Sequence, residues 1–420
     1  MSFVAMDIGA SGNRYVSDSG QISVLPNNMV INDNMTPSRV IPDGNDIESC
    51  LEFTIKKTSG PECNFFPANV MVGIMAERGS STNQRPSVNQ HKYEQRINYI
   101  SIIMACAVSK LKFNLTDNID AHVAVPPVEV HTAQEEFSKL VPGSYEVTFT
   151  KYMDGTTVKF TIDNIYTYEE SYMSALSFFF NVNGTIREDS KKYLTGNVLS
   201  LDIGASTSDL TIVKNGTYMN KSGRTYPIGG NVARDELVDL IYSKYSHDLS
   251  VEEAERTIAE GRLQQGNLYI DVSDLVAQSK VTLAKKLIEN MQAYFRRIDI
   301  DIHSLNAIMV SGGGSMQSQY VDDNNEVIKT SEPLSYYVTN ELVHISPGTD
   351  VIAYGDDARF ANVKGLFIRA KLSETKKKAQ TKPVEAPKTE TPALKVEKKV
   401  DPKMETRAAE VASEVTGETA

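Results

Sequence analysis

Two short stretches, FVAMDIGASG (Phe3–Gly12) and VLSLDIGASTSD (Val198–Asp209), decide the fold of this 420-residue chain. Both open with an apolar run that is typical of a buried β-strand, and both continue into Asp-Ile-Gly-Ala-Ser. One such strand and loop could arise by chance. Two copies, one in each half of the chain, indicate an internal duplication.

The residues that follow each copy repeat the same pattern. Asn13–Ser17 and Asp209–Lys214 are short runs typical of strands, and each run ends at a turn. The second turn is Asn215-Gly216, a strong signal for a β-hairpin. Each half is therefore predicted to open with a strand, a glycine-containing loop, a second strand and a tight turn.

Each half also contains a helical pattern that leads into an apolar strand. In the first half the spacing of apolar residues predicts a helix over Lys92–Leu111, followed by the strand His122–Val125. In the second half the helix is predicted over Val276–Ile298 and the strand over Ala307–Val310. The shared order predicts an α/β protein built from two related domains that face each other across a cleft.

The composition fits such a two-domain protein. Apolar residues make up 40% of the chain, and 420 residues are more than one compact core usually organises. The net charge of -11 argues against a protein that grips nucleic acid over its whole surface. Three scattered cysteines (Cys50, Cys63 and Cys106) are interpreted as thiols in a reducing compartment. Without a signal-peptide pattern or a long apolar run, the expected location is the cytoplasm, with no membrane contact.

The expected domain limits follow from the repeat. Domain I is expected to comprise residues 1–165 and 345–370, and domain II residues 166–344. Residues 371–420 are rich in Lys, Glu, Thr, Pro and Ala, lack aromatic residues, and are expected to form a disordered tail. The run Lys376–Lys378 is interpreted as a solvated part of this tail rather than as a patch that binds DNA.

The two repeated loops have the chemistry of a phosphate site. Small residues after a strand let backbone N–H groups approach phosphate oxygens closely. The aspartates that precede the loops, Asp7 and Asp202, are placed to hold Mg²⁺ through its water shell. A single loop of this kind is as often a plain glycine turn, but two facing copies favour a nucleotide.

A third loop, Ser311–Ser315, follows the second duplicated strand and has the sequence Ser-Gly-Gly-Gly-Ser. Three glycines present a flat backbone surface against which a purine and a ribose can lie. Alone, such a run is more often a flexible turn. Because this loop follows the second duplicated strand, a nucleotide-binding role is favoured over a flexible turn.

In these features the sequence resembles the superfamily of actins, heat-shock chaperones and sugar kinases. Asp7–Arg14 and Asp202–Asp209 look like its two phosphate loops, and Ser311–Ser315 looks like its adenosine loop. Ala361–Leu366 looks like the second connecting helix, and the first connecting helix would fall within Glu169–Phe180. The resemblance implies duplicated ribonuclease-H-like domains, the actin fold, around a nucleotide cleft.

Within the superfamily the chain is most similar to ParM-type bacterial actins over roughly residues 1–370. The resemblance rests on total length, the predicted strand Val72–Ala76, the segment His122–Pro127, the pair Glu170-Ser171 and the ending Ala361–Leu366. It implies an ATPase that uses ATP and Mg²⁺ and assembles with copies of itself into filaments. It also implies that plasmid DNA is moved through a DNA-binding adaptor of ParR type, without direct contact between this chain and nucleic acid.

The resemblance assigns roles to individual residues. Asp7 and Asp202 would hold Mg²⁺ through water, and Glu170 would orient the attacking water, with Glu169 as the alternative. Either glutamate could instead be a solvated carboxylate at a helix N-terminus. Asp209 is expected to tie the second loop together or to reach the metal through water rather than to act as a base. The nucleotide would be bound by Gly9, Ala10, Ser11, Gly12, Asn13, Arg14, Gly204, Ala205, Ser206, Thr207, Gly312, Gly313, Gly314 and Ser315.

One departure from the family pattern concerns Ala10 and Ala205, which replace the hydroxyl or glycine residues common after the loop glycine. Ser11, Ser206 and Thr207 are therefore the expected hydroxyl contacts.

Two questions stay open at the level of sequence. Arg234, Asp235, Glu255 and Arg256 could reach the base or the ribose, although an exposed charged helix is the favoured interpretation. The same fold could also serve a small-molecule kinase or another non-polymerising ATPase. A kinase would need a general base for its acceptor, and no additional acidic loop stands out to supply it. A chaperone would need a folded peptide-binding domain, which residues 371–420 do not offer.

Overall fold

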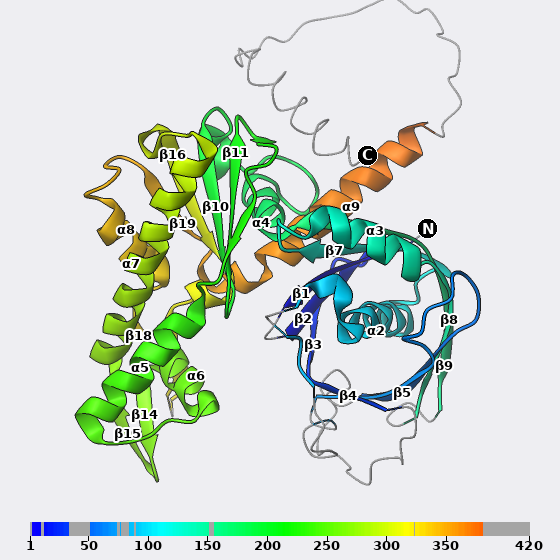
Figure 1. Ribbon diagram of the computed structural model, residues 1–420, viewed down its shortest axis with the longest axis horizontal. Helices are drawn as coiled ribbons and strands as arrows, with labels where there is room; N and C mark the ends of the chain where they lie inside the picture. The colour runs from blue at the N-terminus through cyan, green and yellow to red at the C-terminus, as the bar shows by residue number, and fades with distance from the viewer. Residues whose placement is uncertain are drawn as a thin grey trace, which may run out of the picture.

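The computed structural model describes residues 2–9, 12–32, 51–73, 76, 84–87, 90–150, 155–322 and 324–380. The chain forms two α/β halves that lie side by side, with two helices crossing between them (Figure 1). The two halves are built around one large sheet each.

The sheet of the first half has nine strands in the order β3-β2-β1-β7-β9-β8-β5-β6-β4. β1 pairs with β7 and β7 with β9 in parallel, whereas the other neighbours are antiparallel. The strands are β1 (Ser2–Gly9), β2 (Gly12–Ser17), β3 (Ile22–Leu25), β4 (Met29–Asn32), β5 (Glu52–Lys57), β6 (Ala68–Val72), β7 (Asn118–Val125), β8 (Gly143–Phe149) and β9 (Thr157–Glu169).

The sheet of the second half has the strand order β12-β11-β10-β16-β19, and β13 pairs with β11 off this path. β10 pairs with β16 and β16 with β19 in parallel, while β11 runs antiparallel to β10. The strands are β10 (Asn197–Ile203), β11 (Ser208–Lys214), β12 (Thr217–Tyr218), β13 (Arg224–Tyr226), β16 (Leu305–Ser311) and β19 (Asp350–Ala353).

The order and directions of β3-β2-β1-β7-β9 are repeated by β12-β11-β10-β16-β19. The two Asp-Ile-Gly loops therefore occupy equivalent places, between the first two strands of each half. This repeat confirms the predicted fold class, a duplicated α/β domain.

The helices of the first half pack against its sheet. α2 (Arg96–Phe113) is preceded by a short 3₁₀ turn, η2 (Lys92–Glu94), and α3 (Val130–Leu140) follows β7. Every residue of α2 from Ile97 to Ser109 is buried, because the helix lies inside the curve of the sheet (Figure 1). The predicted helix Lys92–Leu111 is thus interrupted at Gln95, which has an extended backbone.

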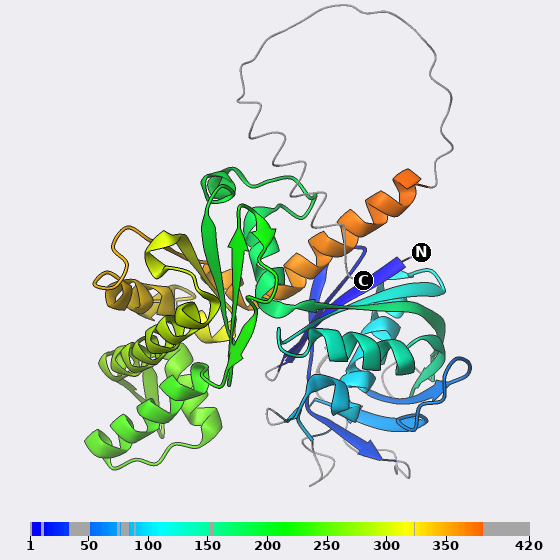
Figure 2. The ribbon, with the colours of Figure 1, turned by 45° about the horizontal axis from the view of Figure 1, so that its top comes forward.

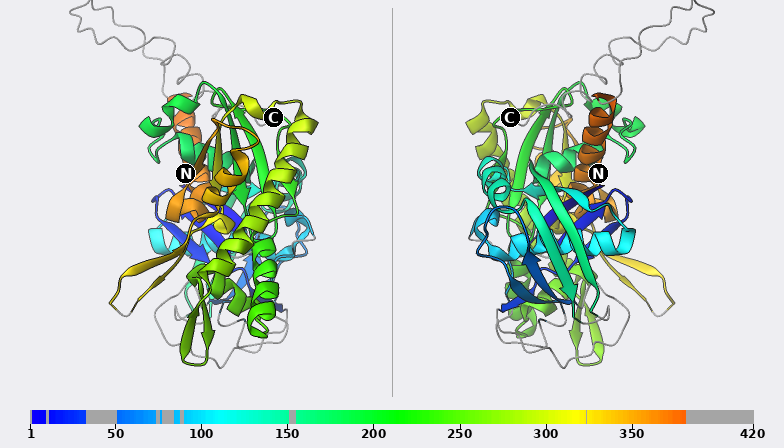
Figure 3. Two further views of the ribbon diagram at one scale, coloured as in Figure 1. Left: turned by 90° about the vertical axis from the view of Figure 1, so that its left-hand side faces the viewer. Right: turned by 90° about the vertical axis from the view of Figure 1, so that its right-hand side faces the viewer.

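The second half carries a long helix, α7 (Ser273–Ile298), beside α5 (Gly230–Tyr245) and α8 (Leu334–Leu342). Its outer part consists of α6 (Val251–Glu260) and two hairpins, which extend away from the main sheet (Figure 3). The hairpins are β14 (Arg262–Gln265) with β15 (Leu268–Asp271), and β17 (Ser318–Val321) with β18 (Val327–Ser331). Three 3₁₀ turns complete this half, η4 (Ile302–Ser304), η5 (Gly313–Ser315) and η6 (Gly355–Phe360), and η3 (Glu188–Tyr193) precedes β10.

Two helices join the halves, α4 (Glu170–Phe179) after β9 and α9 (Ala361–Gln380) after β19 (Figure 2). They pack directly on each other, and a buried apolar cluster at this junction includes Phe3, Met173 and Leu366. A Cβ on Gly365 would collide with the carbonyl oxygen of Met173, so a glycine is needed where the helices cross. Both connecting helices lie where the sequence predicted them.

Several expected limits differ from the structure. The boundary between residues 165 and 166 falls inside β9, and β19 belongs to the second sheet although residues 345–370 were assigned to domain I. α9 continues to Gln380, nine residues beyond the predicted start of the tail at residue 371, and residues 381–420 lie outside the described residues. β6 ends at Val72, the first residue of the predicted strand Val72–Ala76, and Gly73 has a positive φ of 64°, while Ile74 and Met75 lie outside the described residues.

The close crossing of α4 and α9 leads to a first prediction. Gly365→Ala should lower the free energy of unfolding by about 1–3 kcal/mol, because the added methyl group overpacks the junction. Urea denaturation would measure the change. Gly313→Ala is the matched control, since a Cβ there meets no atom within 4 Å and should leave the stability of the nucleotide-free protein unchanged. Equal stability of the Gly365→Ala variant and the parent would contradict the proposed close contact.

Candidate functional site

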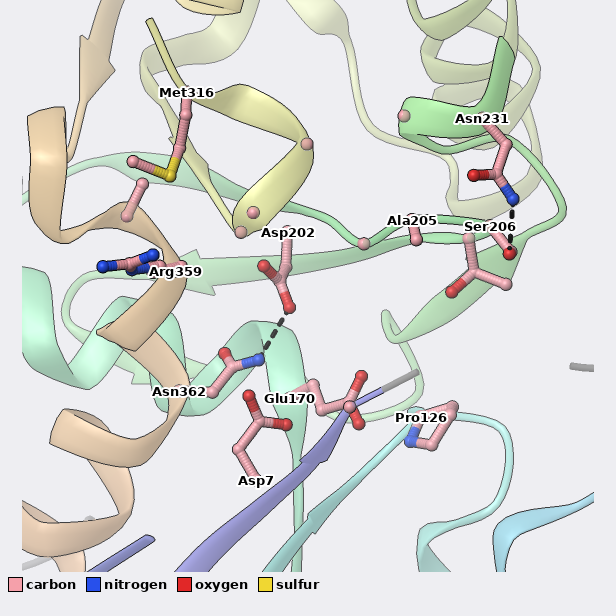
Figure 4. A pocket seen from close by; sticks show the side chains of 18 of the residues that line it. Asp7, Pro126, Glu170, Asp202, Ala205, Ser206, Asn231, Met316, Arg359 and Asn362 are labelled. Carbon is pink, nitrogen blue, oxygen red and sulfur yellow. Dashed lines mark hydrogen bonds between the residues drawn. The ribbon is translucent and has the colours of Figure 1, made fainter. Parts of the chain in front are cut away.

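A cleft of about 640 Å³ lies between the two halves (Figure 4). Residues from all three predicted loops and from the start of α4 line it. Of the predicted site residues, those that line it are Asp7, Gly9, Arg14, Glu170, Asp202, Gly204, Ala205, Ser206, Thr207, Gly312, Gly313 and Gly314.

Three other predicted contacts are placed differently, and two cannot be placed. The buried side chain of Asn13 donates to Ser101 Oγ of α2 at 2.9 Å and does not line the cleft. The buried Ser315 hydroxyl donates to the Gly312 carbonyl at 2.7 Å, and Gly12 is also absent from the lining. Ala10 and Ser11 lie outside the described residues.

Three buried carboxylates, Asp7, Glu170 and Asp202, line the cleft, and the buried carboxylate of Asp209 lies beside them; we call these four residues the acidic cluster. Asp7 and Asp202 occupy equivalent positions near the ends of β1 and β10, and Glu170 is the first residue of α4. One carboxylate oxygen from each of Glu170, Asp202 and Asp209 lies within 4.8 Å of the others. Figure 4 shows the side chains of Asp7, Glu170 and Asp202 converging on one region.

Burial and repulsion from Glu170 raise the pKa values of the three aspartates of the acidic cluster. Burial, and then the Glu170 carboxylate, raises the pKa of Asp202 to about 7. The same two causes raise the pKa of Asp7, and they raise the pKa of Asp209 well above its ordinary value. A cation bound among these groups would favour their ionised forms.

Neighbouring side chains fix the aspartates in place. Asn362 at the start of α9 donates to Asp202 Oδ2 at 2.8 Å, and Ser311 donates to Oδ1 at 3.3 Å. Asn362 also accepts a hydrogen bond from Ser174 of α4, so it links both connecting helices to the cleft. Thr225 of β13 donates to Asp209 Oδ1 at 2.6 Å, which ties the end of the second loop to the neighbouring strand.

Two cations face the acidic cluster. Arg14 Nη1 lies 3.7 Å from Asp7 Oδ2, and Lys92 Nζ forms an ion pair with Glu170. Burial lowers the pKa of Lys92, but the carboxylates of Glu170 and Asp7 outweigh this effect and raise it. Lys92 was missed in the sequence, where it appears only as the first residue of a predicted helix.

The two candidate glutamates at the start of α4 point to different places. Glu169 accepts a hydrogen bond from the Tyr218 hydroxyl at 2.6 Å and does not line the cleft. Burial raises its pKa to about 7. Only Glu170 of this pair lines the cleft together with Asp7 and Asp202, so the geometry favours Glu170, the residue preferred from the sequence.

The loop Gly204–Thr207, which follows β10, is held by its own backbone and by the N-terminus of α5. Gly204 N–H donates to the Thr207 carbonyl, while Gly230 and Asn231 donate to the carbonyls of Gly204 and Ala205. The Asn231 side chain donates to Ser206 Oγ at 2.9 Å. The positive end of the α5 dipole therefore lies against the loop, which favours an anion there.

The third loop needs its glycines for close packing. Gly312 has a φ of 86°, and a Cβ on it or on Gly314 would collide with Ile203, just before the second loop. A Cβ on Gly313 would meet nothing within 4 Å, so this residue leaves an open backbone surface toward the cleft. These properties fit a flat group such as a nucleoside.

The outer wall of the cleft includes Arg234 and Glu255, whose side chains approach to 3.7 Å. Arg234 also pairs with Asp235, and its side chain is only 19% exposed. The favoured interpretation of an exposed helix was therefore wrong for Arg234, although Asp235 and Arg256 are not among the lining residues.

The residues present fit Mg²⁺ together with a nucleoside triphosphate. Four carboxylates against two side-chain cations leave an excess of negative charge that a divalent cation can balance, and oxygen ligands suit Mg²⁺. The Gly204–Thr207 loop and the first residues of α5 line the same cleft, where the positive end of the helix dipole favours the negative charge of phosphate oxygens.

The described cysteines and helices bear on the remaining expectations from the sequence. Cys63 and Cys106 are free thiols, and burial raises the pKa of Cys106 to about 12. Across the described ranges, none of the helices combines the length and apolar character that crossing a membrane requires.

Comparisons with known proteins identify the fold. No protein-family model matches the chain, and no curated protein matches it either. Among solved structures, the actin-like protein Alp7A aligns with a TM-score of 0.65 at 17% identity and covers 90% of this chain and 98% of its own. The archaeal actin homolog Ta0583 gives a TM-score of 0.64 at 15% identity, covering 88% of this chain and 99% of its own. Bacillus thuringiensis ParM with ADP gives 0.62 at 18% identity, covering 89% and 99%.

At these identities the likeness speaks for the fold alone. It agrees with the resemblance to ParM-type actins that the sequence indicated, and with the repeated strand order of the two halves. The chain has the actin fold.

Proposed function

We propose that the protein is an ATPase that binds Mg-ATP in the cleft and polymerises with ATP into dynamic filaments in the cytoplasm. The observation that carries this proposal is that Asp7 and Asp202, from equivalent places in the two halves, line one cleft together with Glu170. A ligand that engages both aspartates contacts both halves at once. Its binding can therefore draw the halves together about α4 and α9.

The structural neighbours support the choice of ligand. The Ta0583 protein has been solved as a complex with ADP, and Bacillus thuringiensis ParM with ADP and with ATP. A further neighbour is described as a non-polymerisable quadruple mutant of pCBH ParM, with a TM-score of 0.58 at 15% identity. Those descriptions support nucleotide binding and assembly as the functions to test in this chain.

Different residues of the cleft would bind the metal ion, the phosphates and the nucleoside. Asp7 and Asp202 would hold Mg²⁺ through its waters, and the ion would supply charge that stabilises the phosphates. The parts of the two loops that line the cleft, Gly9 and Ala205–Thr207, would bind the β- and γ-phosphates through backbone amides. Gly312–Gly314 would provide the surface for the nucleoside.

Glu170 would orient the water that attacks the γ-phosphate. The water oxygen bonds to phosphorus as the bond to the bridging oxygen breaks, and the electron pair of that bond stays with ADP. A proton of the water passes to Glu170 and from there to solvent. Asp209 accepts a hydrogen bond from Thr225 and would hold the end of the second loop in place.

The filament would be linked to plasmid DNA by a separate adaptor of ParR type. A subunit with a net charge of -11 gains little from direct contact with phosphates at physiological salt. The adaptor would supply the basic surface that DNA binding needs.

Sedimentation tests the proposed function. Mg-ATP should move the protein into the pellet, whereas ADP or omission of nucleotide should leave most of it in the supernatant. ATP hydrolysis with no sedimentable polymer under any of these conditions would favour the non-polymerising alternative, a kinase or another ATPase of the same fold.

A further inference from the structure

Lys92 is a cation that lines the cleft beside the acidic cluster, and none of the roles proposed above involves it. Its ammonium group donates to the Ile8 carbonyl at 2.6 Å and to Glu170 Oε1. The side chain is 18% exposed, and that of Glu170 is 10% exposed. The pair therefore joins η2 of the first half to the first residue of a connecting helix.

The backbone of Lys92 is held from both sides. Its N–H donates to Glu129 Oε2 at 2.8 Å, and its carbonyl accepts from Asn98 Nδ2 at 2.9 Å. Gln95 fixes the preceding segment through hydrogen bonds with Ser87 and Gln90. These bonds aim the side chain before any ligand arrives, as a preorganised site requires.

Stability alone does not account for this arrangement. Burying the Lys92 and Glu170 charges costs about as much desolvation free energy as their attraction returns. Two apolar side chains at these positions would therefore stabilise the folded protein equally well. A buried ion pair in a cleft, next to three further carboxylates, is better explained by the chemistry of that cleft.

We propose that Lys92 is a positioning residue, which holds the Glu170 carboxylate in the orientation that engages the attacking water. One carboxylate oxygen, Oε1, is occupied by the ammonium group, and the second can accept a hydrogen bond from water. The inference rests on the proposed ATPase function. It adds a residue that acts through Glu170 rather than on the substrate.

A double-mutant cycle tests this role. The variants are Lys92→Met, Glu170→Gln and the combination, and the measured quantity is the single-turnover rate of ATP hydrolysis at saturating Mg-ATP. Lys92→Met should lower the rate by about a hundredfold, because a misoriented group loses most of its effect. In the Glu170→Gln background the same change should cost less than about twofold, since two residues that act as a unit are not additive.

Two further measurements separate positioning from a general structural role. Lys92→Met should reduce kcat much more than it raises KM, and Lys92→Arg, which keeps the charge, should recover part of the rate. Lys159→Met is the matched control, because this lysine forms a surface pair with Glu146 and its side chain is 73% exposed. The control should hydrolyse ATP at the parental rate.

The opposite results are equally clear. If Lys92→Met lowers the single-turnover rate a hundredfold both in the parent and in the Glu170→Gln variant, the two effects are independent. That result would overturn the positioning role and indicate that Lys92 contacts the substrate itself. If Lys92→Met does not fold by circular dichroism, the same cycle with Lys92→Arg decides between the two. An unmutated protein that hydrolyses no ATP would overturn the proposed function as well, whereas multiplying losses in an active ATPase would overturn the role of Lys92 alone.

Discussion

Glu170→Gln is expected to lower ATP hydrolysis by about 10²- to 10⁴-fold, the range typical of a group that handles the proton of the nucleophile. Glutamine has the shape of glutamate and can still accept the hydrogen bond from Lys92, but it cannot take a proton from water. Since this step follows binding, the affinity for ATP should change little. Polymer formed with ATP should persist, because its loss depends on hydrolysis.

The adjacent glutamate provides the control. Glu169 accepts a hydrogen bond from the Tyr218 hydroxyl and does not line the cleft. The Glu169→Gln variant should therefore hydrolyse ATP at close to the parental rate. Phosphate release by both variants, measured in parallel, decides the assignment. Parental turnover in Glu170→Gln, or a comparable loss in Glu169→Gln, would show that the wrong residue was chosen.

Asp202→Asn is expected to stabilise the nucleotide-free protein at high pH while it removes Mg²⁺-dependent activity. The pKa of Asp202 is about 7 in the folded protein, above its ordinary value of 3.8, because the carboxylate is buried beside Glu170. Below about pH 4 this carboxyl group is protonated in both the folded and the unfolded protein, so it costs no stability there. As the pH rises from 4 through 7, the free energy of unfolding falls, because the unfolded protein ionises Asp202 more easily than the folded protein does. Asparagine stays neutral, so the variant avoids a loss of up to about 4 kcal/mol at pH 8.

Melting temperatures in EDTA at pH 5 and pH 8 would measure this effect. The advantage of Asp202→Asn over the parent should be large at pH 8 and smaller at pH 5, whereas hydrolysis with Mg-ATP should fall at least about a hundredfold. Asp189→Asn is the control of opposite sign, because the hydrogen bond from Arg187 lowers the pKa of this surface carboxylate. Lower stability of Asp202→Asn than of the parent at pH 8 would contradict the account.

Much of the fold was predictable because its signals are local. The repeated loops, the hairpin turn at Asn215-Gly216 and the apolar strands each depend on a few consecutive residues. The first half was harder, because its sheet continues beyond β9 into an antiparallel extension, β8, β5, β6 and β4, that has no counterpart in the described sheet of the second half. The duplication therefore offered no second copy from which to predict these strands.

The interior of the site was only partly predictable, because its key contacts join distant parts of the chain. Lys92 meets Glu170 across 78 residues, and Asn362 meets Asp202 across 160. The choice between Glu169 and Glu170 depended on where β9 ends and α4 begins, and sequence patterns place such boundaries no better than within a few residues. Asn13 was assigned to the nucleotide from its place in the loop, but strand alternation directs its side chain toward Ser101 of α2.

If one nucleotide held by both halves drives assembly, light scattering and phosphate release recorded simultaneously should follow in a fixed order. After addition of Mg-ATP, scattering should rise before most phosphate is released and should then fall as ATP is exhausted. Glu170→Gln should show the rise without the fall, and Asp202→Asn should show neither. Phosphate release by the parent protein with no change in scattering, at protein concentrations up to saturation, would contradict the account.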